Sequence, residues 1–403
     1  MKISLKSMSF LALLFVGIGF LVVSCEKDDV TNGIDPNADI GNPVVKYIRS
    51  TKPEAADSLL VSAFMGSLVA IVGEDLGHTV ELWFNDQQAS LTPTYVTDQT
   101  IIVNVPSSVP TEVNDKIRFV FSNGEEMLYD FKVDVPAPIL RSIKCEYVPA
   151  GGIAVLDGDF YFAPVEVTFP GGAKGEIVSL DKLQLGVIVP EDATSGKITI
   201  STNFGKVESD FIFRDGRGLF WDFDVLNGGG WRPGNLASQD GVSGNYAVLS
   251  GELGGDWDWK DDFLEIDLWG QAAGRPLGPL FNGVPNEMVI KFEVNVVKEW
   301  TGGYMQFIFS PWDNANNSVN SDNKVAKGHW IPWEDEGSFM TDGWVTASLP
   351  LSEFTYTHER TIDNLELDYP DGCGSLSIFV WGPVPLPPND IEIHVDNFRV
   401  VPK

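Results

Sequence analysis

Short apolar runs that alternate with polar residues dominate the chain, and helical periodicity is scarce. The runs are rich in Val, Ile, Phe and Thr, and turns containing Gly, Pro, Asn and Asp separate them. Because successive side chains of a strand point to opposite faces, this alternation with frequent turns favours β-strands over helices. We therefore predict an all-β protein.

Two stretches of the chain repeat the same order of predicted strands. Each copy has an opening apolar run, then a glycine-flanked strand, and later a Val-Pro pair. In the first copy these three features lie at residues 44–48, 66–76 and 105–106. In the second copy they lie at residues 139–143, 151–160 and 189–190. This order resembles the IPT/TIG family of immunoglobulin-like sandwiches, which implies such domains at 43–137 and 138–214. In secreted proteins these modules are usually spacers, and they contain only Trp83 of the twelve tryptophans.

A different domain is predicted at residues 215–403. It opens with Phe-Trp-Asp-Phe-Asp at 220–224 and closes with Asp-Asn-Phe-Arg-Val at 396–400, and between them a Gly-Trp-Val-Thr string starts at 343. These strings resemble the β-jelly-roll of carbohydrate-binding modules. The expected fold is therefore all-β, with tandem immunoglobulin-like (IPT/TIG) sandwiches followed by a glycan-binding β-jelly-roll sandwich.

The N-terminus has the features of an exported lipoprotein. Lys2 and Lys6 precede an apolar run at 10–23, and Cys25 follows. The run is short for a membrane-spanning helix and suits a secretory signal. Small residues before a single cysteine form a lipobox, so we predict a signal peptide at 1–24 and lipidation of Cys25; an uncleaved anchor helix is the alternative.

The segment after Cys25 is predicted to be a flexible tether, at 25–42. It begins Glu-Lys-Asp-Asp, and a Lys followed by two acids resembles the surface-export signal of Bacteroidetes lipoproteins. That resemblance implies an outer-membrane anchor facing the extracellular medium; a solvated charged tether is the alternative. The later residues are polar, rich in Gly, Pro, Asn and Asp, and without periodicity.

The formal net charge of −30 limits the classes of partner that the chain can bind. Phosphate binding needs clustered Lys and Arg, so a nucleic-acid partner is excluded. Without a basic run or a basic amphipathic helix, the bilayer is contacted through the lipid alone. Cys145 and Cys373 fall in different predicted domains, each without a second cysteine at metal-ligand spacing, so we predict two free thiols and no zinc site.

The succession of leader, lipid anchor, two IPT/TIG-like domains and a jelly roll resembles the SusE/SusF-like and other surface glycan-binding proteins of Bacteroidetes, in particular the xyloglucan-binding type. The resemblance implies a non-catalytic lipoprotein that captures polysaccharide for a Sus-like utilisation system. The implied partners are the polysaccharide, surface glycoside hydrolases and a SusC/SusD-like outer-membrane import complex. It does not identify the glycan.

Aromatic rings in polar surroundings are the candidates for sugar binding, because a ring covers the apolar face of a sugar while carboxylates and amides meet its hydroxyls. Pro332 lies between two tryptophans and prevents a regular central strand, so we predict a loop or an edge there. The tryptophans predicted to stack on glycan are Trp330, Trp333, Trp312 and Trp231. Those predicted to be core, because they lie within apolar alternation, are Trp221, Trp269 and Trp344.

Alternation along three predicted strands supplies further candidates. The apolar positions predicted to face inward are Phe292, Val294, Val296, Met305, Phe307, Phe309, Ile378 and Val380. The outward positions then carry Glu293, Asn295, Tyr304, Gln306 and Trp381. We predict that one sheet presents these five side chains together on its concave face; the alternative is that a covering loop buries some of them.

Two other functions stay open. The first is a small jelly-roll glycoside hydrolase or lyase, which would need two carboxylates across a cleft. Acidic residues follow Trp333, but the sequence has no hydrolase motif that we recognise, no Gly-x-Ser-x-Gly elbow and no P-loop. We therefore predict no catalytic residue. A surface adhesin is the other alternative, because exposed aromatics also form protein hot spots. Oligosaccharide should block a glycan site and leave protein binding by an adhesin intact.

Three acids lie near the ends of the predicted jelly roll, Asp222, Asp224 and Asp396. Jelly rolls that it resembles often hold a structural Ca²⁺ there. Calcium takes six to eight oxygen ligands, and these side chains supply only part of such a set. We therefore predict no cofactor and leave a structural calcium ion open.

Overall fold

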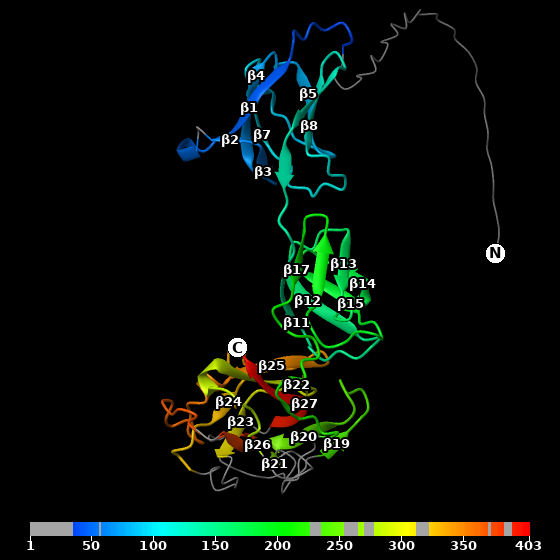
Figure 1. The fold of residues 1–403 in the computed structure, drawn as a ribbon. Coiled ribbons are helices and arrows are strands. Elements are labelled where there is room, and N and C mark those ends of the chain that lie inside the picture. Colours follow the sequence, from blue (N-terminus) through cyan, green and yellow to red (C-terminus); the bar gives the residue numbers. More distant parts are fainter. Residues whose placement is uncertain are drawn as a thin grey trace, which may run out of the picture. The chain divides into compact units, whose positions relative to one another are not determined.

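The computed structural model describes residues 35–55, 58–225, 235–253, 265–269, 278–311, 322–369, 372–382 and 389–403. In these residues the regular elements are strands and short 3-10 helices (Figure 1), so the all-β prediction is confirmed. None of these residues belongs to a helix with the length and apolarity that a bilayer crossing requires. The predicted signal peptide and Cys25 lie outside the described residues. The chain divides into two compact units, residues 1–134 and 135–403.

The first unit contains an immunoglobulin-like sandwich. One sheet has the order β2-β1-β4-β7 and the other β6-β5-β8-β9, while β3 and β10 form a parallel pair. Their bounds are β1 Val44–Ser50, β2 Leu59–Leu60, β3 Ser62–Phe64, β4 Leu68–Glu74, β5 Thr79–Phe84, β6 Gln87–Gln88, β7 Thr100–Asn104, β8 Lys116–Phe121, β9 Glu126–Asp130 and β10 Lys132–Asp134, with 3-10 helices η1 Pro53–Ala55 and η2 Pro93–Tyr95. Ile71, Leu82 and Phe119 are buried between the sheets.

The second immunoglobulin-like domain begins the second unit. Its strands follow the order β11-β12-β15-β14-β13-β16-β17. Their bounds are β11 Ile139–Ile143, β12 Ile153–Asp159, β13 Val165–Thr168, β14 Lys174–Leu180, β15 Gln184–Ile188, β16 Thr199–Thr202 and β17 Gly205–Glu208. Cys145 belongs to its apolar core, and Cys373 to the core of the domain that follows. Both are free thiols, as predicted.

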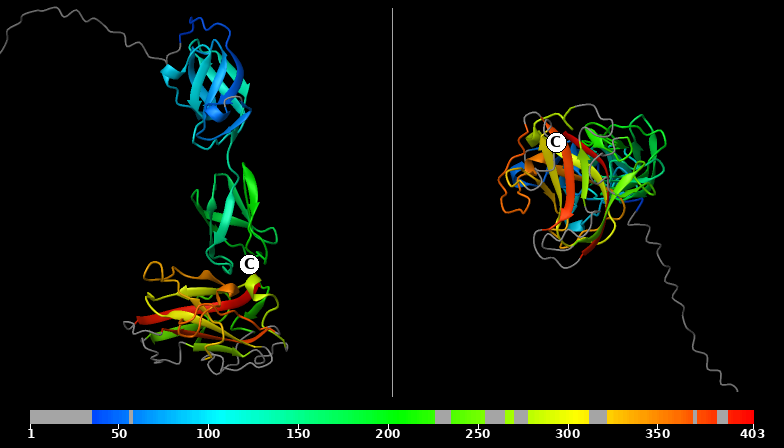
Figure 2. Two further views of the ribbon diagram at one scale, coloured as in Figure 1. Left: turned by 90° about the vertical axis from the view of Figure 1, so that its left-hand side faces the viewer. Right: turned by 90° about the horizontal axis from the view of Figure 1, so that it is seen from below.

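The jelly roll has two facing sheets. The first has the order β19-β20-β27-β22-β25, with β18 also paired to β27, and the second has the order β21-β26-β23-β24. Their bounds are β18 Leu219–Trp221, β19 Asn235–Ala237, β20 Tyr246–Leu253, β21 Glu265–Trp269, β22 Met288–Val296, β23 Tyr304–Pro311, β24 Gly328–Trp330, β25 Val345–Pro350, β26 Cys373–Trp381 and β27 Asn389–Pro402, with η4 Pro285–Glu287 and η7 Leu351–Glu353. We call these the β27 sheet and the β23 sheet. In Figures 1 and 2 the β27 sheet lies on the side of the second immunoglobulin-like domain, and the β23 sheet lies on the far side.

The jelly-roll core confirms the predicted inward faces. All eight apolar residues named for the three strands are buried in one cluster between the two sheets. Phe292 of β22 stacks on Phe398 of β27 and contacts Phe307 of β23, which joins the sheets through aromatic rings. Trp221 is core, as predicted. For Trp269 the structure describes the backbone alone.

Trp344 differs from its prediction as a jelly-roll core residue. It is half-buried and packs against the core of the second immunoglobulin-like domain, to which Val242 of the jelly roll also belongs. The indole N–H of Trp344 donates to the carbonyl oxygen of Asp240 at 2.9 Å. Two loops of the jelly roll therefore extend the core of the neighbouring domain, so the two domains share apolar packing.

Candidate binding groove

The five outward side chains predicted to share one face lie on two different sheets. Glu293 and Asn295 belong to β22 of the β27 sheet, whereas Tyr304, Gln306 and Trp381 belong to β23 and β26 of the β23 sheet. The prediction of a single concave face is therefore wrong. Its physical reason is that the chain crosses between the sheets after β22, and alternation gives the face of each strand but not the sheet that contains it.

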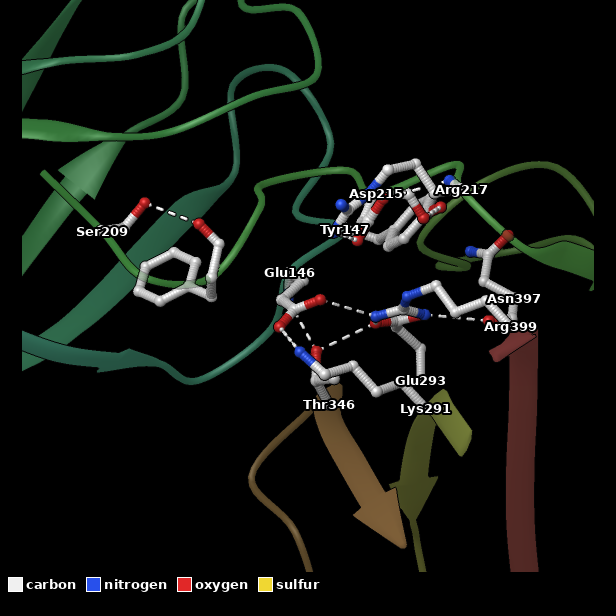
Figure 3. Close-up of polar contacts among 11 residues, drawn as sticks. Glu146, Tyr147, Ser209, Asp215, Arg217, Lys291, Glu293, Thr346, Asn397 and Arg399 are labelled. Carbon is white, nitrogen blue, oxygen red and sulfur yellow. Dashed lines mark hydrogen bonds and ion pairs between the residues drawn. The ribbon is translucent and has the colours of Figure 1, made fainter. Parts of the chain in front are cut away.

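Glu293 lies in an ion network at the junction with the second immunoglobulin-like domain (Figure 3). Its side chain is 0% exposed, and Arg399 donates to both of its oxygens, at 2.8 and 3.0 Å. Arg399 also donates to Glu146 of the neighbouring domain at 2.8 Å, and Lys291 donates to the other oxygen of Glu146 at 2.6 Å. Burial alone would lower the pKa of Arg399, but Glu293 and Glu146 raise it above its ordinary value. The network thus removes Glu293 from the exposed surface predicted for glycan.

Asn295 lies on the same strand as Glu293. It is half-buried, and its side-chain oxygen accepts a hydrogen bond from the hydroxyl of Thr341 at 2.9 Å. Thr341 in turn accepts from the backbone N–H of Val296 at 2.8 Å. Asn295 therefore supports the loop that precedes β25, on the opposite side of the jelly roll from Gln306.

The outward face of the β23 sheet holds a cluster of histidine, tyrosine and glutamine side chains. Gln306 is 0% exposed; its Nε2 lies 2.7 Å from Nε2 of His329, and its Oε1 lies 2.8 Å from Nδ1 of His358. The carbonyl oxygen of His358 accepts from Gln306 Nε2 at 3.2 Å and from the Tyr304 hydroxyl at 2.8 Å. The His358 ring also packs on the half-buried Trp381, with ring centroids 3.5 Å apart. Three of the predicted residues, Tyr304, Gln306 and Trp381, are therefore brought together, but beneath the surface.

Both histidines of this cluster are neutral near physiological pH. Burial lowers the pKa of His329 to about 3, and Arg360 and His358 add to the effect. Burial likewise lowers the pKa of His358 to about 3, with a contribution from Lys327. The cluster is thus a hydrogen-bonded assembly without net charge, in contrast to the ion network on the other sheet.

A groove of about 420 Å³ opens beside this cluster. It lies between β24, the edge strand of the β23 sheet, and β25, the edge strand of the β27 sheet, together with the segment after η7. Its lining combines rings with polar side chains: His329, Trp330, Glu334, Glu353, Tyr356 and Arg360 are among them. Rings flanked by carboxylates, hydroxyls and a guanidinium match the chemistry of a sugar, which has an apolar face and a hydroxyl rim.

Side chains along one wall of the groove are stacked in a column. Arg360 lies over the Tyr356 ring at 4.6 Å, and the exposed Glu334 is 3.5 Å from Arg360. The Tyr356 ring is parallel to His329, with centroids 5.1 Å apart, and His329 stacks on Tyr304 at 4.2 Å. The column holds the polar and aromatic groups of the groove in fixed orientations.

Trp330 ends the edge strand β24, which pairs with β23, and Trp333 lies in the turn that follows it; both positions fit the predicted loop or edge. Trp330 lines the groove but also packs into the core, in edge-to-face contact with Phe292, Trp300 and Phe339. Trp333 is half-buried against the core and donates from its indole N–H to the carbonyl oxygen of Gly303 at 2.9 Å. Glycan stacking on these rings stays a prediction. Trp312 and Trp231 lie outside the described residues.

The proposed calcium position has buried oxygens but few of them. Asp396 is 0% exposed; it accepts from the backbone N–H of Asn397 at 2.7 Å and from Ser243 at 3.3 Å. Burial raises the pKa of Asp396 to about 8, and the nearby Glu293 and Asp224 add to the effect. Within the described ranges no three His, Cys, Asp or Glu side chains are grouped as a metal site would require.

Three groove residues escaped the sequence argument, His329, Tyr356 and Arg360, and so did His358 of the adjoining cluster. Tyr356, His358 and Arg360 lie next to polar residues in a segment without apolar alternation, which is the same signal that selected Trp312. His329 lies between a glycine and a tryptophan and has no such signal. Tyr356 follows the Pro-Leu-Ser-Glu-Phe string by two residues, and this string ends the alternation of β25. An aromatic residue just after such a strand end was therefore a detectable candidate.

Parts of the chain are similar to known proteins. Residues 213–402 match the family model of the surface glycan-binding protein B xyloglucan binding domain. An IPT/TIG domain-containing protein of Bacteroides ovatus is 35% identical over 147 residues, which are 35% of this chain and 28% of that protein. The chain thus covers little more than a quarter of that relative's length.

Two solved structures are similar over 90% of the chain. The surface glycan-binding protein PbSGBP-B from Prevotella bryantii has a TM-score of 0.66 and 27% sequence identity, with 99% of that chain covered. SGBP-B from a complex xyloglucan utilization locus in Bacteroides uniformis has a TM-score of 0.51 and 18% identity, with 100% of that chain covered. The second likeness concerns the fold alone.

Proposed function

We propose that this chain captures a neutral polysaccharide of the xyloglucan class at the bacterial surface without cleaving it, because residues 213–402 match the family model of the surface glycan-binding protein B xyloglucan binding domain. The family match carries the proposal. The groove between β24 and β25 supports it, because it places Trp330 and Tyr356 beside carboxylate, hydroxyl and guanidinium groups. Trp333, Trp312 and Trp231 remain proposed stacking residues beside it.

The charge of the chain favours a neutral ligand. The net charge of −30 repels polyanions such as polyuronates. Within the groove, Glu334 and Glu353 outnumber the single Arg360, which is paired with Glu334. Binding therefore relies on ring stacking and on hydrogen bonds to hydroxyls, as expected for an uncharged glucan.

The carboxyl groups support the proposal of binding without catalysis. A glycosidase needs an acid whose pKa is raised beside the scissile bond. Two described carboxyl groups with a raised pKa are Glu293 and Asp396. Both are fully buried in the β27 sheet, away from the groove. The carboxylates of the groove, Glu334 and Glu353, are exposed to water.

The anchored arrangement explains how weak individual sites hold a polymer. We propose that Cys25 is lipidated at the outer membrane and that the immunoglobulin-like domains act as spacers. Many anchored copies on one polysaccharide then raise the apparent affinity through effective concentration. The captured chain would pass to surface glycoside hydrolases and to a SusC/SusD-like import complex.

Affinity electrophoresis tests the proposal. The protein comprising residues 26–403 is run through gels that contain xyloglucan, mixed-linkage glucan, starch or polygalacturonate. We expect retardation by xyloglucan and none by polygalacturonate. Tyr356→Ala should weaken retardation about tenfold, because stacking on an aromatic ring contributes about 1–2 kcal/mol. Trp83→Ala, which removes a half-buried tryptophan from the first immunoglobulin-like domain, is the matched control.

The outcomes separate the alternatives. Retardation that Tyr356→Ala leaves intact would keep the function and move the site away from this groove. No retardation by any polymer would overturn the proposal and favour an adhesin. Shorter polymer products after incubation would show that the protein cleaves its ligand.

A further inference from the structure

We propose that His329 determines the specificity of the groove by donating a hydrogen bond from its Nδ1–H to an oxygen of the bound sugar. This inference rests on the proposed function of the groove and adds the residue that recognises a hydroxyl there. It follows from the hydrogen bonds that fix the proton on one nitrogen of the ring.

The orientation of the Gln306 amide is the first step. The backbone carbonyl oxygen of His358 only accepts hydrogen bonds, and the amide atom 3.2 Å from it must therefore be the NH₂ nitrogen. The amide oxygen then faces Nδ1 of His358 at 2.8 Å, so this nitrogen carries a proton and donates. A backbone carbonyl thus defines which end of the amide faces each histidine.

The tautomer of His329 is the second step. Its Nε2 lies 2.7 Å from the amide nitrogen of Gln306, which only donates. Nε2 of His329 must therefore accept, and it carries no proton. A neutral imidazole has one N–H group, so the proton of His329 is on Nδ1. The lowered pKa of His329, about 3, keeps the ring neutral.

The Nδ1–H of His329 then lacks an acceptor. The side chain is only 7% exposed, and within the described part of the chain no atom accepts a hydrogen bond from Nδ1. Buried donors without a partner are rare in native proteins and call for an explanation. Stacking on Tyr304 and Tyr356 holds the ring from both faces, so it cannot rotate toward another acceptor.

The groove supplies the place for the missing acceptor. His329 lines it, together with Tyr356 and Arg360. Trp221 and Arg399 also bury an N–H group without a partner, but neither lines this groove. Nδ1 has almost no accessible surface, so a side chain at the groove wall must shift when the sugar oxygen reaches it.

The expected selectivity is for a hydroxyl-bearing neutral sugar. A site built to hydrogen-bond a hydroxyl rejects the analogue that lacks it, because its buried donor is then left unpaired. His329 thus adds a directional requirement to the stacking on Trp330 and Tyr356, which every pyranose ring would satisfy.

Histidine NMR tests the inference directly. The protein comprising residues 26–403, with ¹⁵N-labelled histidine, is titrated with a xyloglucan oligosaccharide at pH 6.5. We expect His329 as the neutral Nδ1–H tautomer and a change of its Nδ1 signal at saturation. His78, exposed in the first immunoglobulin-like domain, should keep its signal. An Nε2–H tautomer, or an unchanged His329 signal while the polymer still retards the protein, would overturn the inference and leave the proposed function standing.

Substitution gives the second measurement. His329→Phe keeps the stacked ring and removes the donor, so affinity for the oligosaccharide should fall about tenfold. His394→Phe, in the β27 sheet, is the control and should leave affinity within about twofold. If His329→Phe fails to fold, Gln306→Met removes the group that fixes the tautomer, and we expect a mixture of tautomers with weaker binding. Unchanged affinity in a folded His329→Phe variant would contradict the inference. Absence of binding to any polymer in the unsubstituted protein would overturn both proposals.

Discussion

The two outward faces of the jelly roll are built from the same alternation of strand residues but contain opposite kinds of polar contact. On the β27 sheet, Arg399, Glu293, Glu146 and Lys291 form a charged network that joins the second immunoglobulin-like domain. On the β23 sheet, Gln306 joins two neutral histidines by hydrogen bonds beside a groove. Charges connect domains on one face, and a neutral cluster borders a candidate ligand site on the other.

This difference shows that the role of an outward-facing polar side chain depends on which residues pack over it. A buried ion network is fixed, because removing one partner leaves an uncompensated charge. A neutral cluster with one unpaired donor can exchange a side-chain contact for a ligand contact at small electrostatic cost. The first arrangement suits attachment of a domain, and the second suits recognition of an uncharged sugar.

Removal of Arg399 should have the largest effect on this contrast. Arg399→Met leaves Glu293 and Glu146 buried without their shared cation, and we expect the free energy of unfolding to fall by about 3–5 kcal/mol. Urea unfolding followed by tryptophan fluorescence measures it, since only Trp83 lies outside the C-terminal domain. Lys298→Met breaks a solvent-exposed pair with Asp390 and should cost far less. Equal losses in both variants would contradict the special role of the network.

The neutral face should make stability fall in acid. The pKa values of His329 and His358 are lowered to about 3 in the folded chain, so below the ordinary value of 6.5 the unfolded chain binds protons that the folded chain does not. His329 then removes up to about 1.4 kcal/mol of stability per pH unit as the pH falls from 6.5 toward 3, and the more exposed His358 removes less. Urea unfolding at pH 6.5, 5.5 and 4.5 measures the slope. His329→Phe should reduce it; a slope unchanged from that of the unsubstituted protein would contradict the assignment.

The charged face should act in the opposite direction through Asp396. Its pKa is raised from 3.8 to about 8, so between these values the folded chain holds a proton that the unfolded chain has lost. Stability therefore falls by about 1.4 kcal/mol per pH unit as the pH rises toward 8. With two histidines opposing one aspartate, maximal stability is expected near pH 6.5. Asp396→Asn should reduce the alkaline loss; a variant that loses as much stability as the unsubstituted protein between pH 6.5 and 8 would show that another group, such as the buried Glu293, is responsible.

Much of the fold was predictable because strand alternation is local. The inward positions of β22, β23 and β26, from Phe292 to Val380, are buried as predicted. The repeat and the jelly-roll strings led to a resemblance that the family match and the fold likeness confirm. These features depend on a few neighbouring residues, and a single sequence contains them.

The site was less predictable because it depends on pairing between distant segments. Glu293 and Gln306 are thirteen residues apart and alternate alike, yet strand pairing places them on opposite faces of the domain. The position of Tyr356 beside His329 arises because the segment near residue 356 pairs with Lys327, at the edge of β24. Alternation cannot specify such pairings, since every strand offers the same two faces.

The central position of β27 has a consequence for how the chain is made. β27 is the last strand of its domain to be synthesised, yet it pairs with β18, β20 and β22 and brings Arg399 opposite Leu219. Until it emerges, the sheet lacks its middle strand, and contacts between such distant residues form slowly. The earlier strands cannot complete the domain during translation. For a chain with a predicted secretory leader, this delay keeps the C-terminal domain unfolded enough to pass through a translocation channel until export ends. Closure of the sheet and docking of the jelly roll onto the second immunoglobulin-like domain then follow as one late folding step.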